Sequence, residues 1–217
     1  MPRLWARRFS PRTAFLVPLP PPAACGLKVD VLPFTNPADQ KAALLALVHH
    51  REALKTTAEA GAVLLFTGNA METLGASVTD AAGKAWPALG LADFTTVETD
   101  RRSPVDVVAR STLWDSPAVG FMNKCSITRG VTTPLFSSLS LGFGNEAEGG
   151  PEGYVSGSVF ATHITGPVLV KNPDFTDLII RRLFAARGWS LPPALPVLPH
   201  EREAYAVTLR ELRGRQK

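Results

Sequence analysis

The sequence predicts an α/β fold that is built on a mainly parallel β-sheet. The first half of the chain alternates strand-like and helix-like segments, which is the order of a parallel sheet with helical crossovers. One strand-like segment, residues 62–66 (AVLLF), is apolar without interruption, as strands buried on both faces are. The length and composition of the chain are consistent with this fold, because 217 residues with 45% hydrophobic and 19% charged residues suffice for one hydrophobic core.

The elements of the first half follow from local patterns. Residues 27–32 alternate apolar and charged side chains, which predicts a strand. Asp39 is placed to cap a helix that the spacing of apolar residues predicts over 40–60. The buried strand 62–66 then passes through a tight turn into a short helix within 67–75, closed by a glycine.

The second half predicts an antiparallel extension of the sheet. Short strands are expected over 93–99, 105–113, 119–127 and 154–164, with a glycine-rich, turn-forming stretch at 142–153. An amphipathic helix is expected over 173–188, and residues 200–217 form a final helix or a frayed tail. Together these elements predict a flavodoxin-like three-layer sandwich with one domain over 26–190.

The two ends of the chain differ in composition from this domain. Residues 1–25 are rich in proline and arginine and are expected to form an irregular arm, with a signal peptide as the alternative. Residues 191–217 are expected to be a proline-rich segment and a basic tail. The net charge of +4 resides in these ends, so a basic face for nucleic acid is not predicted.

Composition also limits the class of protein. No apolar run is long enough to span a membrane, and two cysteines cannot form a disulfide framework. These features favour a cytoplasmic protein. No cluster of residues has metal-ligand spacing, and His49, His50 and His200 are expected at the surface.

The strand and turn at 62–75 have the pattern of a nucleophile elbow. Five sequence blocks in order resemble the class I glutamine amidotransferase domains of the cobyric-acid-synthase type. Within that type they are most similar to the glutaminase subunits of lipid II isoglutaminyl synthases. The blocks are GNAMETLG (68–75), DAAGKAWPALGLADF (80–94), GFMNK (120–124), GFGNEAEGGPEG (142–153) and THITGPVLVKNP (162–173).

The resemblance places the family's nucleophilic cysteine on Gly68 and its general-base histidine on Thr165. Glycine offers no thiolate and threonine accepts no proton near neutral pH, so the pair that hydrolyses glutamine is absent. The resemblance therefore implies a catalytically degenerate subunit that binds a Mur-ligase-like or cobyrinate-type amidating synthetase, in cell-wall (peptidoglycan) or corrinoid chemistry. It implies no cofactor.

Two alternatives stay open, so the sequence does not decide whether the protein is an enzyme. An active glutamine amidotransferase with relocated groups would use Cys125 and His163. His163 shares a strand face with Thr165, although a packed, aromatic-like role is the favoured interpretation. A small-ligand binding module would use the amides of the elbow pocket, with Asn69, Asn145, Glu146 and Glu152 as lining residues.

Two further expectations concern the elbow helix and the front of the domain. Glu72 falls on a family glutamine of the elbow helix and is expected to be an exposed helix residue. The family's first strand and the loop after it have no counterpart in residues 1–25. Either that unit is lost, which would leave an uncovered sheet edge and favour association with a partner, or the chain start is not the natural one.

Overall fold

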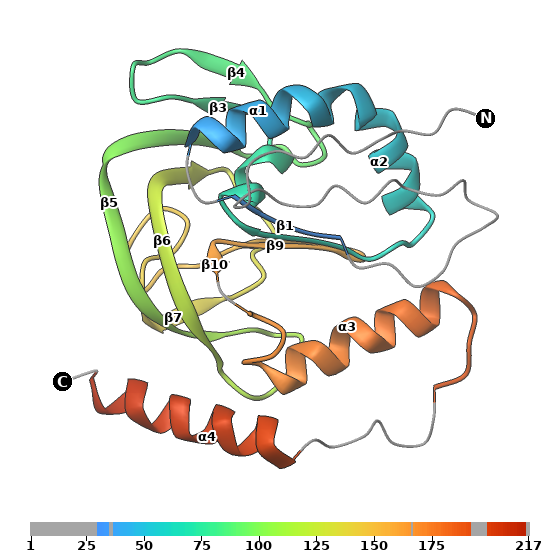
Figure 1. Cartoon of the computed structure of the whole chain (residues 1–217), viewed down its shortest axis with the longest axis vertical. Helices are drawn as coiled ribbons and strands as arrows, with labels where there is room; N and C mark the ends of the chain where they lie inside the picture. The colour runs from blue at the N-terminus through green and yellow to red at the C-terminus, as the bar shows by residue number, and fades with distance from the viewer. Residues whose placement is uncertain (1–29, 35–36, 166, 192–198, 216–217) are drawn as a thin grey trace.

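The computed structural model describes residues 30–34, 37–165, 167–191 and 199–215. It is an α/β structure with two β-sheets, which confirms the predicted class (Figure 1). The predicted arm over 1–25 and most of the proline-rich segment lie outside the described residues.

The first sheet has the strand order β1-β2-β9-β8. Strands β1 (Asp30–Phe34), β2 (Leu64–Gly68) and β9 (Val159–Thr162) pair in parallel, and β8 (Tyr154–Ser156) pairs antiparallel with β9. All five residues of β2 are buried, as the uninterrupted apolar run predicts.

Helices cover both faces of this first sheet (Figure 1). On one face, Leu44 of α1 (Pro37–Leu47) and Leu54 of α2 (Arg51–Glu59) pack with Phe66. On the other face, Phe175 of α3 (Pro173–Ala186) packs with Phe160, at a ring-centroid distance of 5.9 Å.

The helix predicted over 40–60 differs from the observed structure in two details. It is divided into α1 and α2 by the short 3-10 turn η2 (Val48–His50). It also begins at Pro37, which suits the first turn of a helix because proline has no N–H to leave unpaired. Asp39 therefore lies inside the helix and not at its cap.

The second sheet is mostly antiparallel, and the structure does not confirm one mainly parallel sheet. Its strand order is β10-β6-β5-β3-β4, with β7 paired to β5, and within it β3 and β5 run parallel. Its strands are β3 (Ser77–Thr79), β4 (Ala85–Pro87), β5 (Thr95–Arg110), β6 (Ala118–Arg129), β7 (Ser138–Leu141) and β10 (Ile164–Thr165).

Two strand predictions are corrected. The two pieces expected over 93–113 are one long strand, β5, because a register shift between Glu98 and Ser103 absorbs the irregular stretch. The single strand expected over 154–164 is instead β8, β9 and β10. It is divided first at Gly157, whose φ of +56° suits a tight turn.

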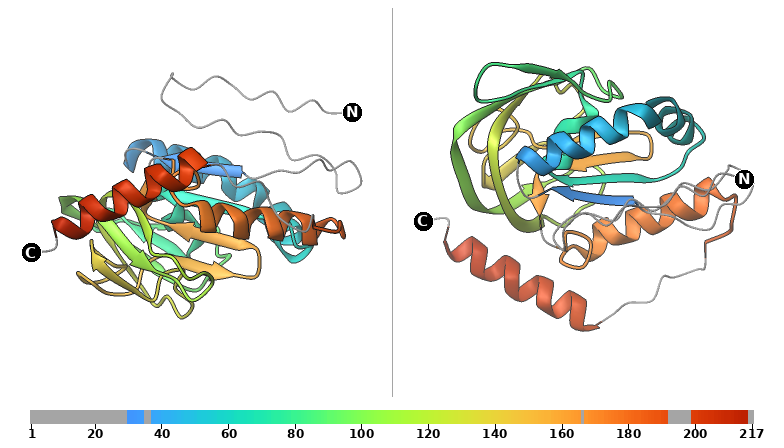
Figure 2. Two further views of the ribbon diagram at one scale, coloured as in Figure 1. Left: turned by 90° about the horizontal axis from the view of Figure 1, so that it is seen from below. Right: turned by 45° about the horizontal axis from the view of Figure 1, so that its top comes forward.

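Helix α4 (Pro199–Gly214) decides between the helix and the frayed tail that the sequence left open. Its Leu212 is buried with Val108 and Val119 on the outer face of the second sheet (Figure 2). The Tyr205 hydroxyl donates a 2.7 Å hydrogen bond to the Pro117 carbonyl.

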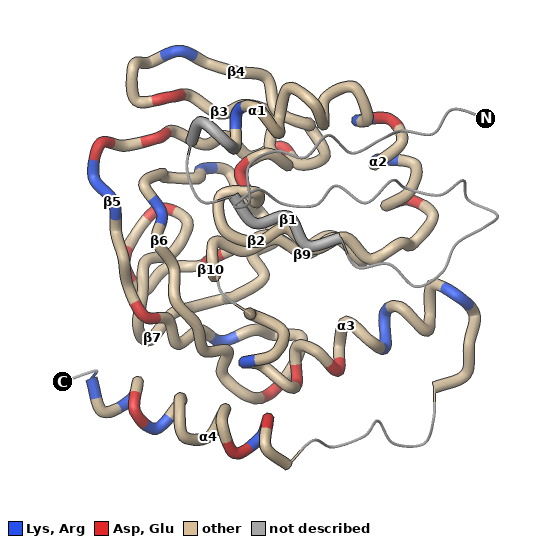
Figure 3. Tube along the Cα trace, viewed as in Figure 1, with Lys and Arg blue, Asp and Glu red and all other residues tan. Residues whose placement is uncertain are grey.

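Along α3 the acids Asp174 and Asp177 precede the arginines Arg181 and Arg182, whereas along α4 charges of both signs are mixed (Figure 3). His49, His50 and His200 are exposed, as predicted. In the part of the chain that the structure describes, no helix has the length and apolar character needed to cross a bilayer.

Candidate functional site

The predicted elbow is present at the end of β2. Gly68 has φ +61° and ψ −144°, a backbone conformation that residues with a side chain rarely adopt. The chain turns there into the short helix η3 (Asn69–Leu74), which Gly75 follows. Strand, sharp turn and helix reproduce the arrangement that exposes a nucleophile in elbow proteins. At its apex this chain has no side chain.

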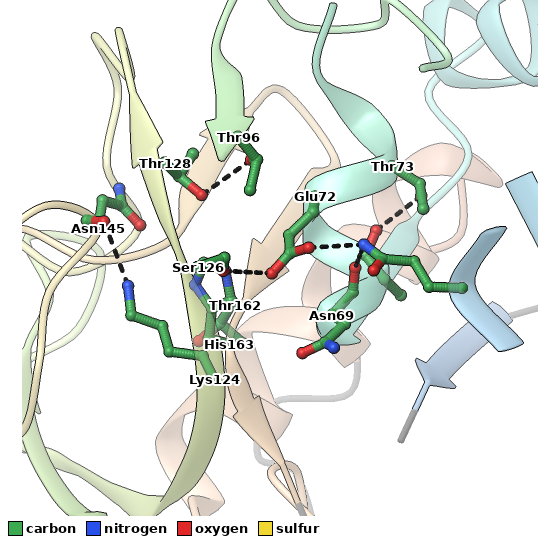
Figure 4. A network of polar contacts seen from close by, with 12 residues as sticks. Asn69, Glu72, Thr73, Thr96, Lys124, Ser126, Thr128, Asn145, Thr162 and His163 are labelled. Atoms are coloured by element: carbon green, nitrogen blue, oxygen red, sulfur yellow. Dashed lines mark hydrogen bonds and ion pairs between the residues drawn. The ribbon is translucent and has the colours of Figure 1, made fainter. Parts of the chain in front are cut away.

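A buried polar cluster lies beside the elbow (Figure 4). The sheet register pairs Thr67 with Thr162, so Gly68 and His163 are the next residues along two neighbouring parallel strands. Functional sites of α/β proteins commonly lie at these carboxyl ends. The cluster comprises Gln40, Glu72, Lys124, Ser126, Asn145, Glu152, Thr162 and His163.

His163 lies between two carboxylates and is only 1% exposed. Its Nδ1 is 3.1 Å from Glu152 Oε1. Its Nε2 is 3.4 Å from Glu72 Oε1, an ion-pair distance without hydrogen-bond geometry. Glu152 is held further by the Thr162 hydroxyl and by the backbone N–H of His163, each donating at 2.7 Å.

Glu72 connects the elbow helix to two other elements. Ser126 of β6 donates a hydrogen bond from its hydroxyl to Oε1 of Glu72. Gln40 of α1 donates from Nε2 to Glu72 Oε2 at 2.6 Å and to the Asn69 carbonyl at 2.9 Å. All polar atoms of this buried carboxylate therefore have partners.

The glycine-rich stretch closes the cluster on the side of β6. Lys124 donates from Nζ to the carbonyls of Gly144 and Asn145. The Asn145 side chain binds both the N–H and the carbonyl of Gly153 at 3.0 Å. A Cβ on Gly144 would lie 2.6 Å from the carbonyl oxygens of Gly150 and Pro151, so the loop requires glycine there.

The cluster shifts the titration of its own members. Burial raises the pKa of Glu72 and of Glu152, but the nearby His163 and the hydrogen bonds that each carboxylate accepts together outweigh burial and hold both pKa values below the ordinary range. Burial and the Lys124 charge lower the pKa of His163, but the two carboxylates outweigh them and raise it above its usual value. Burial lowers the pKa of Lys124 to about 8.

These shifts determine what the cluster can do chemically. The raised pKa of His163 favours its protonated form over the neutral imidazole that a general base requires. Its charge is balanced by Glu72 and Glu152 inside the protein. The arrangement stabilises buried charge and, at Gly68, offers no nucleophile.

Thr165 and Cys125 lie on different strands, β10 and β6. The Thr165 hydroxyl donates to the Phe121 carbonyl at 3.1 Å, across the β10–β6 pair. Cys125 is 9% exposed, and strand alternation directs it to the face of β6 opposite Lys124 and Ser126. Burial raises the pKa of the Cys125 thiol, which disfavours the reactive thiolate.

The residues predicted to bind a ligand divide into two groups. Asn69, Asn145 and Glu152 are buried, and the side chains of Asn145 and Glu152 bind groups of the protein itself. Glu146 is exposed, 4.0 Å from Arg129. A ligand role for these residues stays a prediction.

One sequence prediction about the cluster is wrong. Glu72 is 1% exposed and belongs to the buried network, whereas the sequence predicted an exposed helix residue. Sequence reasoning also missed Lys124 and Ser126. Their signal was the alternation along β6, which places Met122, Lys124, Ser126 and Thr128 on one strand face.

A metal centre receives no support. Among the residues that the structure describes, no group of three or more histidine, cysteine or acidic side chains is arranged to hold a metal ion.

Two curated proteins match parts of the chain. It is 31% identical over 108 residues to subunit GatD of the glutamine-hydrolysing lipid II isoglutaminyl synthase of Staphylococcus aureus. The chain is thus similar to a glutamine amidotransferase subunit. The match covers 48% of this chain and 42% of GatD, so it supports a glutamine amidotransferase-like relationship and nothing finer.

The second match is shorter. The chain is 44% identical over 55 residues to the 7,8-didemethyl-8-hydroxy-5-deazariboflavin synthase of Gloeobacter violaceus, which is 24% of this chain and 17% of that protein. The chain therefore spans less than half the length of either relative. No family model matches it.

Proposed function

We propose that this protein is a catalytically degenerate glutamine amidotransferase-like subunit that binds an amidating synthetase of the Mur-ligase-like or cobyrinate type. It would act in the cytoplasm, in peptidoglycan or corrinoid chemistry, and take part in amidation without producing ammonia itself. The flavodoxin-like sandwich of the amidotransferase domain is part of the same proposal.

The observation that carries the proposal is the elbow at Gly68. The strained backbone and the buried strand before it are retained, but the side chain that such a turn displays is missing. The position of the family base, Thr165, carries a hydroxyl bonded to Phe121. Neither position can supply the thiolate or the imidazole that glutamine hydrolysis requires.

The cluster around His163 gives independent support. Both ring nitrogens of His163 lie against buried carboxylates, Glu152 at 3.1 Å and Glu72 at 3.4 Å, and the raised pKa disfavours the neutral imidazole of a general base. This environment supports a role in binding over a role in glutamine hydrolysis.

Ammonia release from glutamine tests the loss of activity. We expect none from the natural protein, alone or co-expressed with a candidate synthetase of the same genome. The double variant Gly68→Cys, Thr165→His should gain measurable release if only the catalytic pair was lost. Circular dichroism and urea unfolding would establish that the double variant is folded, and the single variants are its matched controls.

One result would contradict the proposed loss of glutaminase activity. Release by the natural protein that disappears in Cys125→Ala would show that the nucleophile has moved and would overturn the proposal. Binding to the synthetase is tested by size-exclusion chromatography of the two purified proteins. Independent elution at micromolar concentrations would contradict the partner role.

A further inference from the structure

A cavity of about 250 Å³ lies next to the buried polar cluster, between α1 and the β3–β4 hairpin, and shares Gln40 with that cluster. Four elements line it: Gln40, Lys41 and Leu44 come from α1, Val78 from β3, Asp80 and Trp86 from the hairpin, and Glu98 from β5. Its volume is near the lower end of the ~300–1,000 Å³ of ligand pockets, so it suits a small ligand.

The aromatic wall of the cavity is held in place by the hairpin. Asp80 accepts hydrogen bonds from the backbone N–H of Lys84 at 2.9 Å and of Ala82 at 3.1 Å. Its second oxygen accepts from Trp86 Nε1 at 3.2 Å. The indole is thereby fixed before a ligand arrives, which lowers the entropic cost of binding.

Two lysine ammonium groups of the protein already contact the indole ring of Trp86. The ammonium of Lys41 lies 3.6 Å from the centroid of the Trp86 ring, and that of Lys84 lies 4.2 Å from it. Such distances are typical of cation–π contacts. The indole thus attracts ammonium groups in this structure.

The charges of the lining favour a cation over an anion. The lining carries two carboxylates, Asp80 and Glu98, and one ammonium, that of Lys41, while the Lys84 ammonium contacts the Trp86 ring without being part of the lining. The half-buried Glu98 also faces the negative field of Glu72, and burial together with that field raises its pKa. A bound cation would relieve this repulsion, whereas a bound anion would add to it.

We infer that this cavity binds a primary ammonium group at the end of a short alkyl chain. Glu98 is the counter-ion, the Trp86 ring contacts the charged end, and Leu44 with Val78 contacts the alkyl chain. A free alkylamine and a lysine side chain of a partner protein share this chemistry. The inference concerns the cavity alone and does not rest on the proposed function.

Gln40 connects the cavity to the elbow. It lines the cavity, is 2% exposed, and donates its side-chain amide to Glu72 and to the Asn69 carbonyl. A ligand that moves Gln40 would therefore alter the hydrogen bonding of the elbow helix. This link predicts that binding in the cavity is sensed at Asn69 and Glu72.

A ¹H–¹⁵N NMR titration tests the site, with the Trp86 indole N–H as reporter. The probes are n-pentylammonium chloride, its uncharged analogue 1-pentanol, and Nα-acetyl-lysine methylamide as the partner-derived form. We expect both ammonium probes to bind with a Kd of about 1 mM, and pentanol at least about tenfold more weakly. Binding of the lysine derivative alone would assign the site to a partner's lysine.

Three variants separate this binding from non-specific association. Glu98→Gln should weaken the ammonium probe about tenfold, and Glu148→Gln, an exposed control in another loop, should leave it unchanged. Lys41→Gln should strengthen binding because it removes a competing ammonium from the Trp86 ring. Equal binding of pentanol, no effect of Glu98→Gln, or weaker binding in Lys41→Gln would each overturn the inference. The inference would also be overturned if neither ammonium probe shifted the Trp86 signal.

Discussion

The buried cluster and the hairpin cavity contain similar residues and use them in opposite ways. In the cluster, His163 is balanced by Glu72 and Glu152 at 3.4 and 3.1 Å, away from solvent. In the cavity, Glu98 is half-buried, faces like charges and has access to solvent. The difference teaches that a high density of titratable groups does not by itself indicate reactivity. Reactivity depends on whether the charges and hydrogen-bonding atoms of those groups are already paired within the protein.

The largest effect is expected when the imidazole of His163, at the centre of the cluster, is removed. His163→Ala leaves two buried carboxylates unbalanced, and we expect a loss of about 3–5 kcal/mol in the free energy of unfolding. Urea denaturation measures the loss. His49→Ala, at an exposed histidine, is the control and should change stability by less than ~0.5 kcal/mol. A loss below about 1 kcal/mol in His163→Ala would mean that the cluster is not held by charge.

The next largest effect concerns the elbow beside the cluster. Gly68→Ala places a Cβ at φ +61° and ψ −144°, and we expect a cost of about 1–3 kcal/mol from backbone strain. The same substitution at Gly214, at the end of α4 with nothing within 4 Å of an added Cβ, provides a comparison without positive φ. If the two variants unfold at the same urea concentration, the elbow is not strained.

The third prediction concerns pH. The folded-state pKa of His163 is raised, so its stabilisation is complete below the ordinary value near 6.5 and is lost as pH rises through the folded value. Glu72 and Glu152 stay ionised in this range, and the burial penalty on the charged Lys124 is relieved only as pH rises through about 8. Between pH 6.5 and 8, we therefore expect stability to fall by at most about 1.4 kcal/mol per pH unit.

Urea titrations at several pH values measure this slope. NMR of the His163 imidazole provides the direct control, since the ring should remain mostly protonated at pH 6.5, where an unperturbed imidazole is half titrated. Stability that rises with pH across this window would contradict the assigned sign.

The smallest effect is expected at the rim of the cavity. Lys84→Gln removes one ammonium from the Trp86 ring and should cost about 0.5 kcal/mol, the usual value of an exposed cation–π contact. Lys55→Gln, on the exposed side of α2, is the matched control. A cost as large as that of His163→Ala would remove the distinction between the two regions.

The sequence predicted the elements better than it predicted their partners. The strand at β2, the turn at Gly68 and the helix α3 could be located because periodicity and glycine act locally. The division into two sheets could not be predicted, since the pairing of β2 with β9 depends on contacts between distant segments.

The candidate site shows the same limit. The family resemblance places the catalytic positions on Gly68 and Thr165, and the chemistry of these two residues predicts that neither acts in catalysis. The role of Glu72 could not, because its partners Gln40, Ser126 and His163 come from three other segments of the chain. A glutamate within a short helix is an exposed residue on average, and only the fold reveals a buried counter-ion.

The position of β9 between β2 and β8 has a consequence for the newly synthesised chain. Leu64 pairs with Val159, so the centre of the first sheet stays open until nearly three-quarters of the sequence has left the ribosome. The apolar edge of β2 is exposed for that time, when it could pair with strands of other chains. We therefore expect the pairing of β2 with β9 to be a late and slow step of folding, because it joins segments far apart in the sequence.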